Sequence, residues 1–363
     1  MTTVMLLGPA LNAVSGVTTH LNQLFSCSLS RDFQLVHFQV GSEGRQESRL
    51  RKLLRFAWSP VQFVRALRVH RPQIVHINTS MEMKSYWRDL VYLLLAKAMG
   101  KRVLYQVHGG ALPQVFFGGK GLLTGLLRRV LRLPDALILL AQCELLGYRR
   151  FDAALAPEVI PNAIDAGTDA GAKPFAPLRP LSLVYVGRLA DSKGLFELVE
   201  AMRLVRGAGV AATLALVGSG PADAALRERV AALGLQREVT FLGQKFGAEK
   251  DAAWRDADLF GFPTHHEGLP YALLESMAAR TPALVCPVGA IPDVMQDGVH
   301  GVFVPPRNAQ ALADAIVRLD GDRALLARMG QACRERIERH YTVERLAQDF
   351  RRVYRALLAP PAI

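Results

Sequence analysis

Glu267 and Glu275 are two carboxylates eight positions apart, and they mark the stretch of the chain with the clearest chemical meaning. The turn Gly268-Leu269-Pro270 follows the first carboxylate, and an Ala/Leu-rich helix is predicted to carry the second. Because a carboxylate accepts hydrogen bonds from two neighbouring hydroxyls, a pair of carboxylates suits a sugar or a ribose. The alternative is two solvated surface glutamates, since Glu is usually exposed.

Two cations, Arg188 and Lys193, lie where a predicted strand runs into a helix. Gly187 permits a close turn after the strand, and both cations fall near the helix start. A helix N-terminus already favours anions, so two cations there predict a diphosphate site. A surface Arg and a surface Lys are the alternative. The segment does not match a Walker P-loop, because the spaced glycines before a Gly-Lys-Ser/Thr are absent.

Three further junctions place small or polar groups after predicted strands. Gly218-Ser219-Gly220-Pro221 and the segment from Ser15 to His20 offer backbone that a ligand can approach, although each also fits an ordinary tight turn. His108 follows a buried strand and precedes two glycines. Its neutral imidazole could donate to or accept from a sugar hydroxyl, and a structural loop histidine is the alternative.

The elements that must position these residues alternate between strand and helix. Strands are predicted at 4–7, 34–40, 74–77, 103–107, 136–140, 159–162, 182–186, 213–217, 239–242, 258–262 and 283–286. Helices are predicted near 17–29, 48–69, 85–99, 120–132, 194–207, 221–233, 248–255, 270–280 and 343–358. Near-continuous apolar strands between helices indicate parallel sheets covered on both faces. The predicted fold class is therefore α/β, with two doubly wound Rossmann-like domains facing across a cleft that holds the ligand.

The predicted domain boundaries follow composition. Residues 1–165 form the first domain, the Pro/Gly/Ala-rich segment 166–180 is the linker, and residues 181–340 form the second domain. Residues 341–363 hold a last helix that could pack on either domain.

The charge is unevenly distributed. The 363 residues carry a net charge of +12, and residues 1–165 hold 20 Lys/Arg against 10 Asp/Glu, whereas the remainder holds 24 against 22. A basic first half suits a phosphate-bearing ligand, an anionic membrane surface or nucleic acid. Nucleic acid is disfavoured, because no helix-turn-helix or zinc pattern is present.

Cysteine usage and hydropathy suggest a cytoplasmic protein. The four cysteines have neither metal-type spacing nor a disulfide framework. The N-terminus reads as a first buried strand, and the longest apolar run, Leu90–Ala96, is too short to cross a bilayer. Basic residues mix with apolar ones at 49–58, 63–68, 116–123 and 126–132. This mixture predicts peripheral binding to the inner face of the plasma membrane, with ordinary amphipathic helices as the alternative.

Taken together, the junctions resemble the retaining glycosyltransferases of family 4, also called glycosyl transferases group 1, which have the two-Rossmann GT-B fold. The resemblance is strongest from Val184 to Pro306. Five motifs there occur in family order and spacing, namely the turns at 187–194 and 218–221, Phe241-Leu242-Gly243, the glutamate pair, and Asp297-Gly298-Val299-His300-Gly301. Two residues depart from the family pattern, because Ala163 and Ser15 stand where glycine is usual.

The resemblance implies a role for each candidate residue. Arg188 and Lys193 would bind a nucleotide diphosphate, Glu275 the ribose hydroxyls, and Glu267 and His108 the transferred sugar. The catalytic set would be His108, Arg188, Lys193 and Glu267. The donor-binding set would be Gly16, Val17, Gly187, Arg188, Lys193, Gly218, Gly243, Lys245, Phe246, Glu267, Gly268, Leu269, Pro270 and Glu275.

The resemblance also implies the reaction. A UDP- or GDP-sugar would donate the sugar to a lipid-linked or oligosaccharide acceptor in exopolysaccharide or lipopolysaccharide biosynthesis. Neither a metal nor a cofactor is implied, because fixed cations neutralise the leaving group. Retention would follow a front-face route, with Glu267 as a nucleophile disfavoured. The rival functions are a sugar-nucleotide epimerase and an NAD-dependent oxidoreductase; the latter lacks the expected Gly-x-Gly-x-x-Gly.

Overall fold

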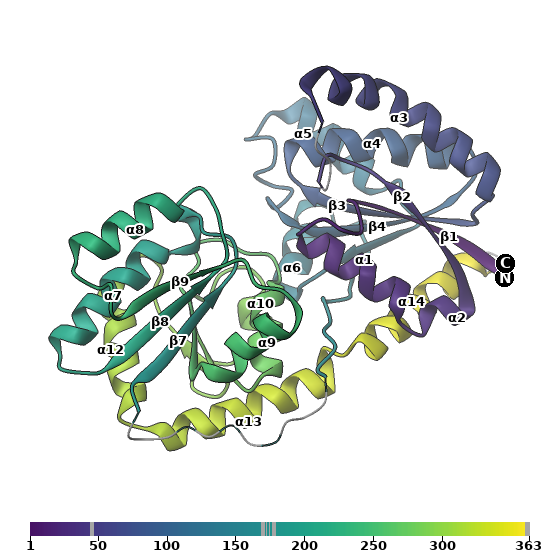
Figure 1. Cartoon of the computed structure of the whole chain (residues 1–363). Helices are drawn as coiled ribbons and strands as arrows, with labels where there is room; N and C mark the ends of the chain where they lie inside the picture. Colours follow the sequence, from purple (N-terminus) through teal and green to yellow (C-terminus); the bar gives the residue numbers. More distant parts are fainter. Residues whose placement is uncertain (44–46, 168–170, 172, 174, 176–178, 360–363) are drawn as a thin grey trace. The chain divides into compact units, whose positions relative to one another are not determined.

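The chain folds into two compact units. The computed structural model describes residues 1–359 except 44–46, 168–170, 172, 174 and 176–178. Unit 1 comprises Met1–Ala163 and Val343–Ile363, and unit 2 comprises Ile164–Thr342. Each unit holds a six-stranded parallel sheet flanked by helices (Figure 1). The predicted α/β class with two Rossmann-like domains is confirmed. The segment interpreted as a linker lies in unit 2, partly outside the described residues.

Unit 1 has the strand order β2-β1-β3-β4-β5-β6. Its strands are β1 (Thr2–Gly8), β2 (Phe33–Gln39), β3 (Ile74–Met81), β4 (Arg102–Gly110), β5 (Ala136–Leu139) and β6 (Glu158–Val159). Its helices are α1 (Gly16–Ser26), α2 (Leu29–Asp32), α3 (Arg49–His70), α4 (Met83–Ala98), α5 (Gly121–Leu131), α6 (Gln142–Phe151) and α14 (Val343–Leu358). The sequence pattern did not predict α6. Helices α3, α4 and α5 cover one face of the sheet, and α1, α2 and α14 lie on the other (Figure 1).

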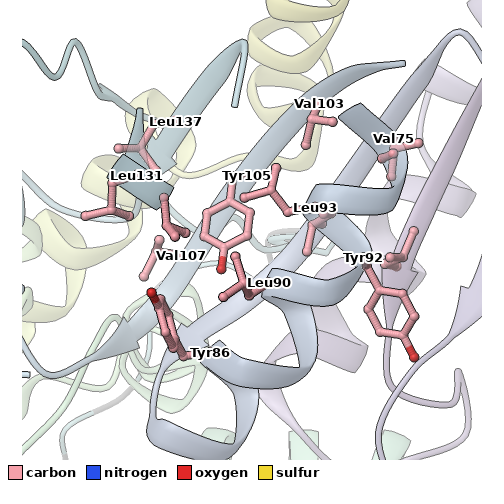
Figure 2. Packing of buried hydrophobic residues seen from close by; sticks show 14 of the residues in the cluster. Val75, Tyr86, Leu90, Tyr92, Leu93, Val103, Tyr105, Val107, Leu131 and Leu137 are labelled. Atoms are coloured by element: carbon pink, nitrogen blue, oxygen red, sulfur yellow. The ribbon is translucent and has the colours of Figure 1, made fainter. Parts of the chain in front are cut away.

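One core of unit 1 lies between α4 and the sheet. Leu90 and Leu93 on α4 pack in the same buried cluster as Val103 and Tyr105 on β4 (Figure 2). Burying a side chain of this size contributes about 1.5–3 kcal/mol. The cluster therefore fixes β3 and β4, the strands that carry Asn78 and His108.

Helix α14 closes the opposite face of the unit 1 sheet. Leu346, Phe350 and Tyr354 recur at the spacing of one helix face and are fully buried. They pack in one cluster with residues of β1 and α1, and Arg351 Nε pairs with Asp32 Oδ2 at 2.6 Å. The last helix of the chain thus belongs to unit 1, although the sequence pattern left its position open.

Unit 2 has the strand order β12-β11-β10-β7-β8-β9. Its strands are β7 (Leu181–Val186), β8 (Ala212–Val217), β9 (Val239–Gly243), β10 (Leu259–Phe262), β11 (Ala283–Val285) and β12 (Gly301–Phe303). Its helices are a 3-10 turn η1 (Asp191–Lys193), α7 (Leu195–Gly207), α8 (Asp223–Ala232), α9 (Gly247–Asp256), α10 (Tyr271–Ala278), α11 (Ile291–Val294), α12 (Ala309–Asp320) and α13 (Arg323–His340). The elements β12, α11, α12 and α13 were not predicted from the sequence.

The exposed and buried residues of unit 1 correct part of the predicted membrane-binding stretches. Phe63 and Leu67 on α3 belong to the core, as do Phe117, Leu127 and Leu131. The apolar residues at these positions therefore stabilise the fold. Within the part of the chain that the structure describes, no helix combines the length and the apolar character needed to cross a bilayer.

Candidate functional site

Lys193 and Glu267, which lie 74 residues apart in the sequence, form an ion pair in unit 2. Lys193 ends the turn η1 after β7, and Glu267 lies in the loop after β10. Thr264 Oγ1 donates to the same carboxylate oxygen, Glu267 Oε1, at 3.1 Å. The Lys193 and Glu267 side chains are 22% and 12% exposed, so a ligand can reach both. The second oxygen, Oε2, has no partner among the described residues and can accept a hydrogen bond.

The two loops meet because β7 and β10 are neighbouring strands and Gly194 has no side chain. Gly194 has a φ of 68°, and a Cβ there would lie 2.0 Å from the Pro263 carbonyl oxygen. The His265 N–H donates to the Ser192 carbonyl at 2.9 Å across the same contact. Glycine is therefore required where the Lys193 turn approaches the Glu267 loop.

Three predicted glycines come together at the carboxyl ends of β7, β8 and β9. The Gly218 N–H donates to the Gly243 carbonyl at 2.8 Å, and the Gly187 N–H donates to the Val217 carbonyl at 3.0 Å. Gly218 has a φ of 146°, and a Cβ there would lie 1.8 Å from the Gly187 carbonyl oxygen. Bare backbone thus forms this edge of the sheet, where ligands of doubly wound folds bind.

Arg188 is exposed beside these glycines, and its guanidinium has no partner among the residues that the structure describes. Its carbonyl accepts from the Tyr185 hydroxyl at 2.8 Å. Burial raises the pKa of Tyr185, and the charge of Glu267 adds to that effect. The hydroxyl therefore stays protonated and holds the backbone that leads to the free guanidinium.

Glu275 lies on α10 and is held by two donors from α9. Lys250 Nζ approaches Glu275 Oε1 at 2.7 Å, and Trp254 Nε1 donates to Oε2 at 3.2 Å. Lys250 and Trp254 are four residues apart, so they share a face of α9. Each predicted glutamate thus has its own lysine. No hydrogen bond or ion pair joins Glu267 to Glu275 within the described part of the chain.

The remaining predicted residues of unit 2 lie around these groups. Lys245 Nζ pairs with Glu249 at 3.1 Å, and Phe246 is 59% exposed at the start of α9. The Gly268 carbonyl accepts from the Ala290 N–H at 3.1 Å, Leu269 is buried, and Pro270 precedes α10. The backbone after Glu267 is therefore fixed, whereas the Phe246 ring is free to meet a ligand.

Gly16, Val17 and His108 lie in unit 1. Gly16 begins α1, and Ser15 caps the helix by accepting from the Thr18 N–H at 3.3 Å. Serine is a favoured N-cap residue, so the departure from glycine at position 15 supplies a cap. Helix α1 also carries His20, whose ring centroid lies 4.9 Å from that of His108.

The sequence pattern placed His108 after a strand, and this placement is wrong. His108 lies within β4, which continues to Gly110 and pairs with the extended β3. Its Nε2 lies 2.8 Å from Asn78 Oδ1. Burial holds the pKa of His108 well below its usual range, and the neighbouring His20 and His76 reinforce this effect. His108 is therefore a neutral hydrogen-bonding group rather than a cation.

Sequence reasoning missed the side chains that hold the predicted ones. They are Asn78, Lys250, Trp254 and Thr264. Two signals could have found some of them, namely a polar residue at the end of the apolar run that begins at Ile74, and a Lys and a Trp four residues apart on one helix. Among the described residues, no group of three or more His, Cys, Asp or Glu side chains could hold a metal ion.

Comparison with known families gives a match that lies within unit 2. Residues 170–336 match the family model described as glycosyl transferases group 1. The chain is 32% identical over 191 residues to the putative colanic acid biosynthesis glycosyltransferase WcaL of Escherichia coli strain K12. That match covers 50% of this chain and 47% of WcaL, so the chain spans about half the length of that relative.

Two solved structures are similar over nearly the whole chain. Sucrose-phosphate synthase from Thermosynechococcus elongatus has a TM-score of 0.80 and 19% identity, with 99% of each chain covered. Anabaena Alr3699/HepE in complex with UDP and glucose has a TM-score of 0.77 and 16% identity, with 98% of this chain and 100% of that chain covered. At such identities the likeness establishes the fold.

Proposed function

Residues 170–336 belong to the glycosyl transferases group 1 family, and on this premise we propose that the chain is a retaining glycosyltransferase. It moves a sugar from a nucleotide-diphosphate sugar to a saccharide acceptor in the biosynthesis of a surface polysaccharide. The observation that carries the proposal is the Lys193–Glu267 pair at the glycine-lined end of β7 and β8. In this pair, Lys193, a cation that can bind a diphosphate, contacts Glu267, a carboxylate that can bind a sugar.

Lys193 and Arg188 supply the positive charge that the reaction needs. Cleavage of the bond to the donor sugar leaves a nucleoside diphosphate with developing negative charge. Cations fixed beforehand stabilise that charge more in the transition state than in the ground state, and this difference accelerates the reaction. The two fixed cations are the reason for proposing a metal-independent transfer.

Glu267 is proposed to bind the transferred sugar through its open oxygen, Oε2. Its other oxygen is occupied by Lys193 and Thr264, which hold the carboxylate in place. A carboxylate already paired with a cation is a poor nucleophile, so attack by the acceptor on the same face as the departing diphosphate is favoured. That route retains the anomeric configuration.

Glu275 is proposed to accept hydrogen bonds from the ribose hydroxyls. A double-mutant cycle tests this role by comparing two nucleotides on the natural protein and on a Glu275 variant. Glu275→Ala should weaken binding of the preferred nucleoside diphosphate, chosen among UDP, GDP and ADP, by about 10- to 100-fold, since hydrogen bonds to a charged group contribute about 1.5–3 kcal/mol. The 2′,3′-dideoxy form should bind the natural protein and the variant equally weakly. Calorimetric titration measures all four affinities.

Glu335→Ala is the matched control, because Glu335 is a carboxylate with a 43% exposed side chain that pairs with Arg339 on α13 of the same unit. Its nucleotide affinity should stay unchanged. If the dideoxy nucleotide loses as much affinity for Glu275→Ala as it does for the natural protein, Glu275 does not contact the ribose.

We also propose that unit 1 binds an anionic membrane surface, where a lipid-linked acceptor would be found. On α3 the large apolar residues Leu50, Leu54, Trp58 and Val61 are exposed, on the side opposite the buried Phe63 and Leu67. On α4 the same 4-4-3 spacing repeats in an exposed row. That row is Met83, Trp87, Val91 and Leu94. An apolar face that stays exposed outside the core indicates an external partner.

The charge of α3 decides between possible partners. The helix holds six Lys/Arg and no acidic residue. A symmetric pairing of two copies through this face would bring like charges together. A surface that is both apolar and anionic, such as the inner leaflet, satisfies the apolar row and the cations at once.

Replacing Leu54 and Trp58 together with Ser should reduce binding to vesicles that contain phosphatidylglycerol by at least about 10-fold, since each side chain contributes about 1.5–3 kcal/mol when buried. Both side chains are about 60% exposed, so folding should be unaffected. The control is Leu146→Ser, an exposed leucine on α6. A flotation assay at low salt measures the effect. Equal flotation of all three proteins would refute the surface.

A further inference from the structure

Three polar groups on three neighbouring strands of unit 1 form a short chain of contacts. Asn78 Nδ2 lies 2.9 Å from the Leu7 carbonyl oxygen on β1, and Asn78 Oδ1 lies 2.8 Å from His108 Nε2 on β4. Asn78 itself lies on β3, between the other two strands, and is buried. Sequence reasoning singled out His108 as a site residue but did not single out Asn78.

The direction of each hydrogen bond follows from the Leu7 carbonyl, which can act only as an acceptor. A backbone carbonyl only accepts, so the amide nitrogen of Asn78 must face Leu7 and donate. The amide oxygen of Asn78 then faces His108 and can only accept. His108 must therefore carry a proton on Nε2. A neutral imidazole has one N–H, so its Nδ1 is left as an acceptor.

The His108 imidazole has the neutral charge state and the unpaired ring nitrogen that this tautomer requires. Burial beside His20 and His76 lowers the pKa of His108, so the ring is neutral at pH 7. Among the described residues, Nδ1 of His108 has no hydrogen-bond partner. His76 differs, because its Nδ1 contacts the Tyr354 hydroxyl at 2.7 Å and its Nε2 contacts Gln106 Oε1 at 2.9 Å. Both ring nitrogens of His76 thus have partners within the fold, whereas His108 has a partner only at Nε2.

We propose that Asn78 is a positioning residue that locks His108 in the Nε2–H tautomer, so that Nδ1 accepts a hydrogen bond from a hydroxyl of the transferred sugar. The sugar contact rests on the proposed function, whereas the tautomer does not. An acceptor selects for a free hydroxyl at the contacted carbon, because a deoxy or O-alkylated sugar cannot donate. The site therefore takes a sugar with a free hydroxyl at that position.

Nuclear magnetic resonance of the full chain labelled with ¹⁵N-histidine tests the tautomer without any substrate. The His108 signals are identified by their loss in His108→Asn. In the natural protein, Nε2 should resonate as a protonated ring nitrogen and Nδ1 as an unprotonated one. The reverse pattern would overturn the proposal, whatever the protein's activity.

Two variants test the role of Asn78. In Asn78→Ala the ring should exchange between tautomers, whereas in Asn78→Asp it should keep the Nε2 proton and titrate at a higher pH beside the new carboxylate. The control is Asn22→Ala, since Asn22 also donates to a carbonyl of unit 1, that of Leu11 at 3.0 Å. Among the described residues, no hydrogen bond joins Asn22 to a histidine. An unchanged His108 spectrum in Asn78→Ala would overturn the positioning role.

The activity readout separates this inference from the proposed function. With a nucleotide sugar that the protein uses, Asn78→Ala should lower kcat/KM roughly 10-fold, the scale of one hydrogen bond. Binding of the nucleoside diphosphate alone should be unchanged, because Asn78 and His108 are proposed to act on the sugar alone. Transfer at the natural rate by Asn78→Ala would overturn the sugar contact. If no nucleotide sugar binds, the proposed function and the sugar contact fail together, while the tautomer assignment is decided by the spectra.

Discussion

Lys193→Ala is expected to lower the rate of sugar transfer by about 10²–10³-fold, the cost of removing one group that stabilises developing charge. Lys193 is the cation nearest to Glu267, and the turn before α7 holds it at the glycine-lined edge of unit 2. Its loss removes the positive charge that is proposed to stabilise the leaving diphosphate. It also leaves the partly buried Glu267 without its ion-pair partner.

The effect should appear mainly in kcat, because the interaction grows as charge develops on the leaving group. Steady-state kinetics with the preferred nucleotide sugar measure it. Arg203→Ala is the matched control, since Arg203 pairs with Glu200 at 2.7 Å on the surface of α7, and its kcat should be unchanged. A Lys193→Ala variant with near-natural kcat would remove Lys193 from the reaction.

Gly218→Ala is expected to destabilise unit 2 by more than about 3 kcal/mol, since it combines a steric clash with a strained backbone. The new Cβ would lie 1.8 Å from the Gly187 carbonyl oxygen, at a φ of 146° that side chains rarely adopt. Relief of the clash requires β7 and β8 to separate at the edge where the donor is proposed to bind. Nucleotide affinity should therefore fall even at temperatures where the variant remains folded.

Gly207→Ala provides the contrast within the same unit. Gly207 is the last residue of α7, and a Cβ there meets nothing within 4 Å. Alanine should leave stability unchanged or raise it slightly. Thermal unfolding followed by circular dichroism compares the two variants. Equal stability of Gly218→Ala and the natural protein would contradict the close packing of these strand ends.

The fold was predictable because its signals are local. The apolar runs at 4–7 and 182–186 lie within β1 and β7, and the helix predicted at 343–358 is α14. Helix α13 was missed because its arginines resemble a solvated pattern. Arg334 is in fact buried and donates to the carbonyls of Ala166 and Ala278. A charged side chain that serves buried carbonyls cannot be recognised by hydrophobic periodicity.

The candidate site was predictable in its members but not in their pairing. Glycines and charges at the ends of strands pointed to Gly187, Lys193 and Glu267, since those ends meet at one edge of a sheet. The contact of Lys193 with Glu267 depends on the close approach that Gly194 allows, and the restraint of Glu275 depends on α9. Such contacts come from tertiary packing, which a strand-by-strand interpretation does not contain.

Release of nucleoside diphosphate tests the central claim most directly. The protein is incubated with UDP-, GDP- and ADP-sugars, with and without a bacterial lipid extract as the source of acceptor. We predict that one class of donor releases its nucleoside diphosphate only when the extract is present, and that Lys193→Ala loses this release. Release that does not need the extract and is equal in Lys193→Ala would contradict the account, as would no release from any donor.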